Sequence, residues 1–149
     1  APENAAPAAV HAEGAGFDIR YIAGEVGALD IGSFELVTAM EVIEHVADKA
    51  AFVEALAGRL APGGLMVLST PNRTPQSRLL MVGAAEGLGL IPKGTHHWDD
   101  FITPEELGEL LGEAGLEMGE PRGIGFSPAK GLHLSGDLSL NYIVTARAR

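Results

Sequence analysis

The sequence of 149 residues contains no cysteine, so a disulfide framework, a thiolate zinc site and a cysteine nucleophile are excluded. Basic residues are also scarce, with 10 Lys and Arg against 20 Asp and Glu. The resulting net charge of −10 would repel a phosphate backbone, so we expect no nucleic-acid partner. The first residues lack the basic start and apolar core of a signal peptide, so we expect a cytoplasmic location.

Long apolar runs and two common catalytic motifs are missing as well. The longest nearly uncharged stretch, Leu79 to Ile91, has 13 residues and includes Glu86, which is too short to span a bilayer. Neither Ser69 nor Ser77 lies in a Gly-x-Ser-x-Gly motif, which disfavours a serine hydrolase. The Gly-rich run 123–125 lacks the third glycine of a phosphate-binding loop.

What is present favours one α/β domain over residues 1–149. Hydrophobic residues make up 46% and charged residues 20% of the chain, values typical of globular proteins. Helix-like and strand-like segments alternate, which indicates a mostly parallel sheet. We expect a helix over 2–14, strands over 18–23, 34–40 and 65–70, and a C-terminal antiparallel strand pair over 117–125 and 138–146, joined by a Gly-rich connection.

Two further helices have clear start signals. Asp48 can cap a helix that ends at 62–64 and buries apolar residues at helical spacing, among them Leu60. Thr103 is followed by Pro104 at the first helical position and by Glu106, the pattern of an N-terminal capping box. Its apolar face is formed by Leu107, Leu110, Leu111 and Ala114, with Gly115 as the residue after the cap.

Polar residues directly follow the strand that ends at Met40. If the chain turns helical there, Glu41, Glu44 and His45 stand at i, i+3 and i+4 and project from one face. Two carboxylates and an imidazole could bind a divalent cation, and the oxygen-rich set favours Mg²⁺ over zinc. The alternative is a solvated first helical turn in which His45 bonds a backbone carbonyl.

The connection over 71–102 is long enough to be interpreted as an insert or lid. It contains a second cluster of ligand-type residues at 95–100. The alternative is that Asp99 or Asp100 caps a short helix and Trp98 packs on the core. Three basic residues bracket its apolar part and are either solvated or ligand-binding: Arg73, Arg78 and Lys93.

Several motifs together resemble one family. They are 34–46, the Leu-Ala-Pro-Gly-Gly turn at 60–64, Ser-Thr-Pro-Asn-Arg at 69–73, Pro-Lys-Gly-Thr-His at 92–96 with 101–104, and Leu-Asn-Tyr at 140–142. The combination is similar to that of the ubiquinone-biosynthesis O-methyltransferases, which are class I enzymes dependent on S-adenosylmethionine. The resemblance implies a class I methyltransferase (Rossmann-like) fold.

In that family the first strand, its glycine-rich loop and the acidic residue ending the second strand precede the segment matched by residues 1–4. The resemblance therefore implies a truncated fold, a single partial methyltransferase domain. In isolation it is expected to be inactive and to bind S-adenosylmethionine weakly or not at all. Met40, at the end of its strand beside the adenosine, is the cofactor-binding residue that the resemblance retains.

The implied reaction is O-methylation of a polyprenylated catechol or quinol in ubiquinone biosynthesis. Glu41, Glu44 and His45 would hold Mg²⁺, with Glu44 and His45 as catalytic residues, and His45 as general base is the competing role. The alternatives are another small-molecule class I methyltransferase or an inactive fragment. Residues 78–93 would touch the inner membrane surface or the prenyl tail, and we expect a quinone-biosynthesis protein complex as a further partner.

Overall fold

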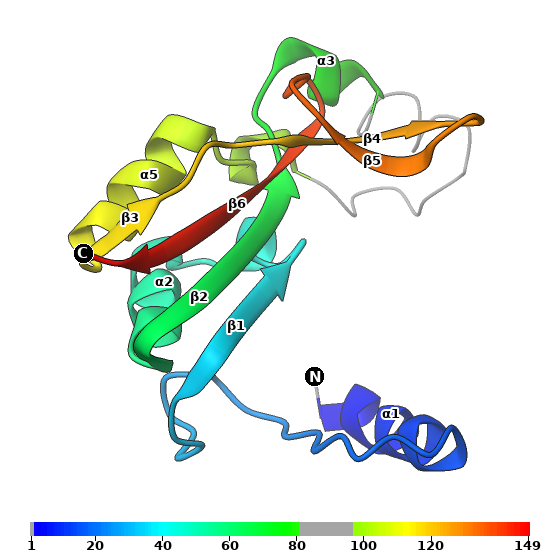
Figure 1. The fold of residues 1–149 in the computed structure, drawn as a ribbon, viewed down its shortest axis with the longest axis vertical. Coiled ribbons are helices and arrows are strands. Elements are labelled where there is room, and N and C mark those ends of the chain that lie inside the picture. The colour runs from blue at the N-terminus through cyan, green and yellow to red at the C-terminus, as the bar shows by residue number, and fades with distance from the viewer. Residues whose placement is uncertain (1, 81–96) are drawn as a thin grey trace. The chain divides into compact units, whose positions relative to one another are not determined.

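The computed structural model describes residues 2–80 and 97–149 (Figure 1). The chain divides into two compact units, residues 1–31 and 32–149, and each is described by itself. In the first, helix α1 spans Pro2–Gly14, as predicted. The strand predicted over 18–23 is wrong, because these residues have no regular secondary structure. A strand needs a neighbour for its backbone hydrogen bonds, and residues 2–31 contain no other strand.

The second unit contains a four-stranded sheet in the order β1-β2-β6-β3. Its strands are β1 Phe34–Met40, β2 Leu60–Pro71, β3 Leu116–Met118 and β6 Asn141–Ala148. The β1–β2 pair is parallel, and β6 is antiparallel to both of its neighbours. The α/β class is confirmed, but the described sheet is mixed rather than mostly parallel, because β6 runs back between β2 and β3.

The carboxyl ends of strands β1 and β2 lie side by side at one end of the sheet. Leu36 pairs with Leu65, and Met40 pairs with Ser69. Among residues 32–80 and 97–149, β1 pairs with β2 alone, so its other edge carries no strand. The carboxyl ends of this parallel pair are the position at which open α/β sheets bind ligands.

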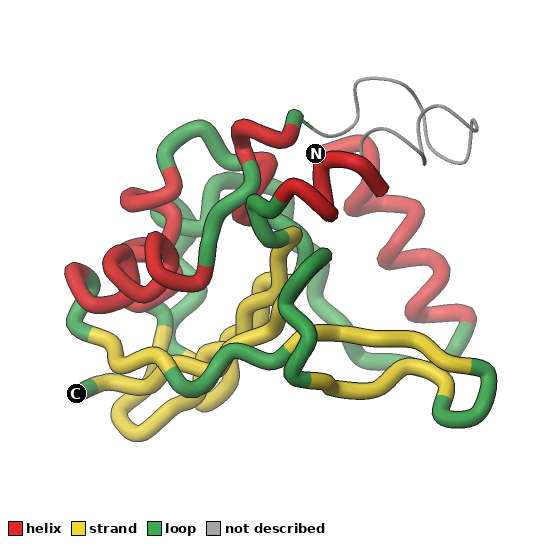
Figure 2. Tube along the Cα trace, turned by 90° about the horizontal axis from the view of Figure 1, so that it is seen from above, coloured by secondary structure: helices red, strands yellow, loops and turns green. Residues whose placement is uncertain are grey.

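One layer of helices covers a face of the sheet (Figure 2). Helices α2, Lys49–Ala57, and α5, Pro104–Glu113, pack against each other and against the strands. Among the described residues, no helix is long and apolar enough to cross a membrane. The buried side chains between the layers include Val53 and Leu56 of α2, Leu107 and Leu111 of α5, Met66 and Leu68 of β2, and Tyr142 and Val144 of β6.

The hydroxyl of Tyr142 ties β6 to the segment that leads into α5. It donates a hydrogen bond of 3.1 Å to the carbonyl oxygen of Ile102. Burial, reinforced by the charges of Glu106, Glu105 and Glu44, raises the pKa of the Tyr142 hydroxyl. The phenol therefore stays protonated and serves as a fixed donor.

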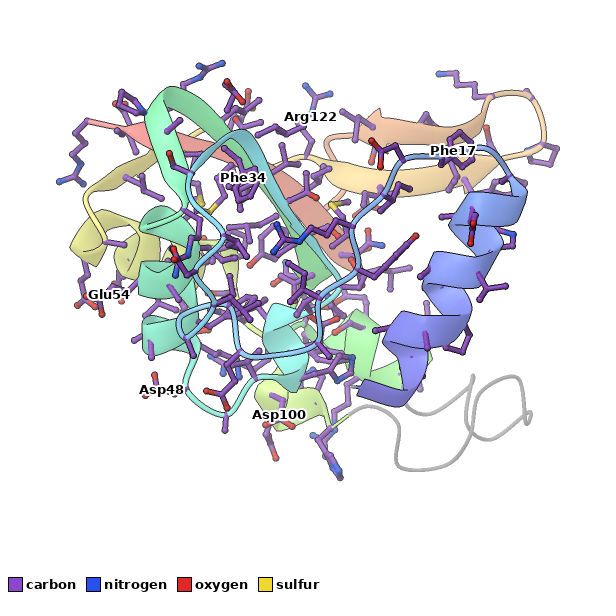
Figure 3. All side chains as sticks on the ribbon, turned by 90° about the horizontal axis from the view of Figure 1, so that it is seen from below. Phe17, Phe34, Asp48, Glu54, Asp100 and Arg122 are labelled. Carbon is purple, nitrogen blue, oxygen red and sulfur yellow. The ribbon has the colours of Figure 1, made fainter. Side chains whose placement is uncertain are left out.

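The predicted Asp48 cap is confirmed. The Asp48 side chain accepts a 2.9 Å hydrogen bond from the Ala51 N–H at the start of α2 (Figure 3). The helix ends at Ala57, earlier than predicted, since Leu60 belongs to β2 and not to the apolar face of the helix.

The predicted Thr103 capping box is also confirmed. Thr103 Oγ1 accepts from the Glu106 N–H at 3.3 Å, and Glu106 Oε2 accepts from the Thr103 N–H at 2.9 Å. Gly115 follows the helix with a φ of 79°, a left-handed value at which glycine has no steric penalty. Local signals therefore fix both ends of α5.

Glu106 is expected to make the stability of the protein pH-dependent. The Thr103 N–H, and then the Arg73 guanidinium, lower the pKa of the Glu106 carboxyl from 4.5. A carboxyl with a lowered folded-state pKa contributes stability above its unfolded pKa, which is lost as pH falls through the folded value. Glu106→Gln keeps the hydrogen bonds of the cap but removes the charge. Because the Arg73–Glu106 ion pair is partly exposed, we expect the variant to lose about 0.5 kcal/mol of the free energy of unfolding at neutral pH.

Urea unfolding of parent and Glu106→Gln protein at several pH values measures this difference. It should be present at pH 7 and shrink below pH 4.5. Glu109→Gln, on the same helix, is the control and should show a smaller difference. A Glu106→Gln difference that persists unchanged at low pH would contradict the assignment to the charge.

The C-terminal segment holds more strands than predicted. β3 pairs antiparallel with β6, as expected for the predicted pair. However, the range 117–125 contains parts of two strands, β3 and β4, Gly123–Ser127. β4 pairs antiparallel with β5, Gly131–Ser135, which lies in the predicted Gly-rich connection. The prediction of a loop there is wrong, because alternating apolar and polar residues at 132–135 form a short strand.

Candidate functional site

Met40 marks the start of the candidate site. It is the last residue of β1, and the residue is 45% exposed. Its strand partner in β2 is Ser69, followed by Thr70. Two side chains capable of hydrogen bonding therefore lie beside the residues that leave β1.

Glu41 leaves the strand with an unusual backbone. Its φ of 54° lies in the left-handed region, which is uncommon for a residue other than glycine. Its N–H donates to the Ser69 carbonyl oxygen at 2.9 Å, and its Oε1 accepts from Ser69 Oγ at 2.7 Å. These two hydrogen bonds hold the Glu41 carboxylate at the end of the parallel pair.

Glu44 is a buried carboxylate within the short 3-10 helix η1, Ile43–His45. The residue is 3% exposed, and its Oε2 accepts from Thr70 Oγ1 at 3.1 Å. Its Oε1 has no hydrogen-bond partner among the described residues. A buried carboxylate oxygen without a partner is costly, so this atom is suited to a cation, a protonated base or a substrate hydroxyl.

His45 provides such a base beside Glu44. Its Nε2 lies 3.9 Å from Glu44 Oε1, and its side chain is 52% exposed. Glu44 and His45 both line a cavity of about 370 Å³, a volume in the range of small-molecule sites. The other residues of the wall include His97, Asp100 and Phe101.

The helical arrangement predicted for the three candidate ligands is not observed. Glu41 precedes η1 instead of lying on a helix with Glu44 and His45, because its left-handed backbone turns the chain first. Within the ranges that the structure describes, no three His, Asp or Glu side chains are grouped so as to hold a metal ion. The magnesium site of Glu41, Glu44 and His45, and the catalytic roles of Glu44 and His45, stay predictions.

The second cluster is only partly described, because Thr95 and His96 lie outside the described residues. The basic residue Lys93 also lies outside them. Trp98–Asp100 form a 3-10 helix, η3. Its N-cap residue is His97, which makes no capping hydrogen bond through its side chain. The predicted short helix is therefore present, but neither aspartate caps it. Trp98 Nε1 donates to the Thr74 carbonyl oxygen at 2.9 Å, and the Arg78 guanidinium lies 5.2 Å from the ring centroid.

These contacts bring together the two ends of the insert predicted over 71–102. Thr74 caps the short helix α3, Pro75–Ser77, which lies just after β2. Arg73, predicted as solvated or ligand-binding, forms an ion pair with Glu106 of α5. The two ends of the insert are thus fixed to each other and to the helical layer.

Ser69 and Thr70 are site residues that the sequence analysis missed. Both are buried, and each donates a hydroxyl hydrogen bond to one of the predicted glutamates. The available signal was their position at the end of a strand neighbouring β1. Their partners are 28 and 26 residues away in sequence, so only the β1–β2 register identifies the pairs.

Comparison with known proteins gives one family-model match. Residues 3–120 match the model of a methyltransferase domain. A ubiquinone biosynthesis O-methyltransferase of Methylobacterium sp. is 41% identical over 150 residues, covering 98% of this chain and 60% of the relative. One of Cereibacter sphaeroides is 45% identical over 154 residues, covering 100% of this chain and 62% of the relative. The chain thus spans about three fifths of these curated relatives.

Two solved structures show a similar fold. The YcgJ protein from Bacillus subtilis has a TM-score of 0.69 at 12% identity, over 100% of this chain and 80% of that one. A magnesium protoporphyrin IX methyltransferase from Synechocystis, solved with bound S-adenosylhomocysteine, has a TM-score of 0.64 at 16% identity, over 97% and 59%. At these identities the likeness concerns the fold alone.

Proposed function

The chain belongs to the methyltransferase-domain family and has its class I fold, and from this we propose that it serves S-adenosylmethionine-dependent O-methylation of a polyprenylated catechol in ubiquinone biosynthesis. The observation that carries the proposal is the 41–45% identity, over 98–100% of the chain, to enzymes named ubiquinone biosynthesis O-methyltransferases. The geometry of Glu44 and His45 supports a site that handles a proton.

Methyl transfer from a sulfonium to a phenol is a displacement. The phenol oxygen forms the new bond to the methyl carbon, and the sulfur leaves with the electron pair of the broken bond. Alignment of the two reactants supplies much of the rate. The phenol must also lose its proton, because the phenolate is the stronger nucleophile.

His45 is suited to take that proton. Its ring lines the cavity and is half exposed, so a substrate hydroxyl can reach it. Glu44 Oε1, 3.9 Å from His45 Nε2, would stabilise the imidazolium that forms. Thr70 Oγ1 holds the other oxygen of Glu44 and so orients the carboxylate. For the cofactor, the exposed Met40 is the proposed contact with the adenosine.

We propose that the site also binds Mg²⁺. Glu44 Oε1, which has no hydrogen-bond partner among the described residues, and the oxygen-rich donor set agree with a hard cation. The described side chains do not themselves form a group of three ligands. When bound, such an ion would lower the pKa of a chelated catechol hydroxyl. Glu41, Glu44 and His45 are the residues that we propose to hold it.

The proposed location is the inner face of the membrane, where a polyprenylated substrate resides. Residues 78–93 are the proposed contact with the membrane or the prenyl tail, and 81–93 lie outside the described residues. Leu79 and Leu80, at the described end of this segment, are 69% and 50% exposed. A complex with other quinone-biosynthesis proteins is proposed as the wider context.

The experiment that tests the function uses the full-length protein carrying this sequence. It should transfer the labelled methyl group of S-adenosylmethionine to a short-prenyl catechol, with the product identified by mass spectrometry. An analogue with both catechol oxygens already methylated is the control, and it should accept no label. Absence of product under conditions in which the Cereibacter sphaeroides relative is active would refute the proposal.

A further inference from the structure

The cavity beside Glu44 and His45 is lined by two segments that lie far apart in the sequence. Residues 44–47, at η1, supply one part of its wall. The other part comes from η3 and the residues that flank it, and consists of His97, Asp100 and Phe101. Figure 3 shows Asp100 at this second segment. The proposed reaction uses only the first part, so the polar groups of His97 and Asp100 have no task in it.

The backbone holds His97 and Asp100 in one fixed turn. The Asp100 N–H donates to the His97 carbonyl oxygen at 2.9 Å, which closes the turn between them. Trp98 Nε1 donates to the Thr74 carbonyl oxygen and so ties η3 to the segment after β2. His97 and Asp100 are exposed, whereas Phe101 is 1% exposed. The second segment therefore offers two accessible polar side chains beside a buried aromatic ring.

A catechol has two neighbouring hydroxyls, and His45 can take the proton of only one of them. The other hydroxyl needs a partner when it enters the cavity, because a buried hydroxyl without a hydrogen bond is costly. Apart from Glu44 and His45, the polar side chains of the described wall are His97 and Asp100. A hydroxyl donates one hydrogen bond and accepts others, a carboxylate only accepts, and an imidazole N–H donates. The two side chains can therefore satisfy one hydroxyl together.

We propose that Asp100 and His97 bind the catechol hydroxyl that is not methylated and thereby determine which oxygen receives the methyl group. The inference rests on the proposed function, in which His45 takes the proton of the attacked hydroxyl. The other hydroxyl donates its proton to the Asp100 carboxylate, and the His97 N–H donates to the same oxygen. With this hydroxyl held at η3, only its neighbour is aligned with the methyl group of the cofactor.

The ratio of the two methylated isomers tests the proposal. The substrate is a short-prenyl catechol with two inequivalent hydroxyls, offered to the full-length protein, and NMR identifies the products. The parent should form mainly one isomer. Asp100→Ala should shift the ratio roughly tenfold toward the other isomer, from the loss of a charged hydrogen bond, and His97→Ala should shift it less. Asp100→Asn keeps an acceptor and His97→Asn keeps a donor, so both should stay closer to the parental ratio.

Asp99→Ala is the matched control. It removes a carboxylate from the neighbouring exposed residue of η3, which lines a different cavity, and it should leave the isomer ratio unchanged. A structural role of Asp100 would slow the formation of both isomers alike and would not change their ratio. The ratio therefore separates recognition of the hydroxyl from support of the fold.

Calorimetry gives a second readout that needs no methyl transfer. The parent should bind the catechol more tightly than the monophenol that lacks the second hydroxyl. Asp100→Ala should reduce this preference roughly tenfold, by weakening catechol binding alone. The preference should be unchanged in Asp99→Ala.

The outcomes distinguish this inference from the proposed function. If the parent forms both isomers equally, or if the variants keep the parental ratio, the inference is overturned while methyl transfer stands. If the parent transfers no methyl group, the proposed function fails and calorimetry decides the inference. Equal binding of catechol and monophenol by the parent, or an unchanged preference in Asp100→Ala, would then overturn it.

Discussion

Glu44→Gln in the full-length protein is expected to lower methyl transfer roughly 10²–10⁴-fold, the range for loss of a group that supports general base catalysis. The carboxylate of Glu44 is buried, and its Oε1 faces His45 Nε2 at 3.9 Å. A neutral amide cannot stabilise the imidazolium at that distance. The amide oxygen can still accept from Thr70 Oγ1, so the fold around η1 should be retained.

Initial rates at saturating cofactor measure this effect. Glu54→Gln makes the same change at an exposed position of α2 and should leave the rate unchanged. The split between kcat and KM separates chemistry from structure, because loss of the carboxylate should lower kcat and leave the KM for the substrate nearly unchanged. A folded Glu44→Gln protein with the parental rate would show that Glu44 has no part in the reaction.

The same variant tests the proposed magnesium site. If Glu41 and Glu44 are ligands, the Glu41→Gln and Glu44→Gln variants should need more Mg²⁺ for half-maximal activity, because an amide is a poorer ligand for a hard cation. Val42→Ala, between the two glutamates, is the control. Lost activity with an unchanged response to Mg²⁺ would leave Glu44 as a partner of the base and remove the metal from the mechanism.

Local signals in the sequence predicted the elements whose ends are set by neighbouring residues. Asp48 and Thr103 cap helices through side chains that reach only three residues along the chain. Such contacts form wherever the local sequence allows them. The predicted end of α2 lies too far along the chain for a different reason. Leu60 has the spacing of a helical residue, but it is the first residue of β2.

Strands were predicted less well, because a strand depends on a partner that may be distant in sequence. Residues 18–23 have a strand-like sequence and no strand beside them in their unit. Residues 131–135 look like a Gly-rich loop but pair with β4 across a short turn. The antiparallel course of β6 was predicted in part, from the alternating pattern of the C-terminal tail.

The candidate site likewise has features that the local sequence predicts and features that depend on distant contacts. The sequence placed Glu41, Glu44 and His45 after a strand, where ligand-binding residues of α/β sheets lie. It did not show that Glu41 turns into the left-handed region or that Glu44 is buried against Thr70. Both features depend on the β1–β2 register, a contact between segments nearly thirty residues apart.

Phe101→Ala is expected to cost about 3–5 kcal/mol of the free energy of unfolding, the usual range for a buried phenylalanine. Phe101 is 1% exposed and lies between η3 and α5. It also forms part of the wall of the cavity that contains Glu44 and His45. Removal of the ring leaves a void that the neighbouring Ile102 and α5 cannot fill without moving the Tyr142 hydrogen bond.

Urea unfolding of the full-length protein gives the comparison, with Phe126→Ala as the matched control. The same atoms are removed there from a side chain that is 73% exposed, so stability should change by less than about 0.5 kcal/mol. Because stability is typically only about 5–15 kcal/mol, the Phe101→Ala protein should be assayed at low temperature. Its methyl-transfer rate should still fall there, since the widened cavity no longer holds the substrate hydroxyl against His45. Equal stability losses in the two variants would mean that Phe101 is not the buried support of the site.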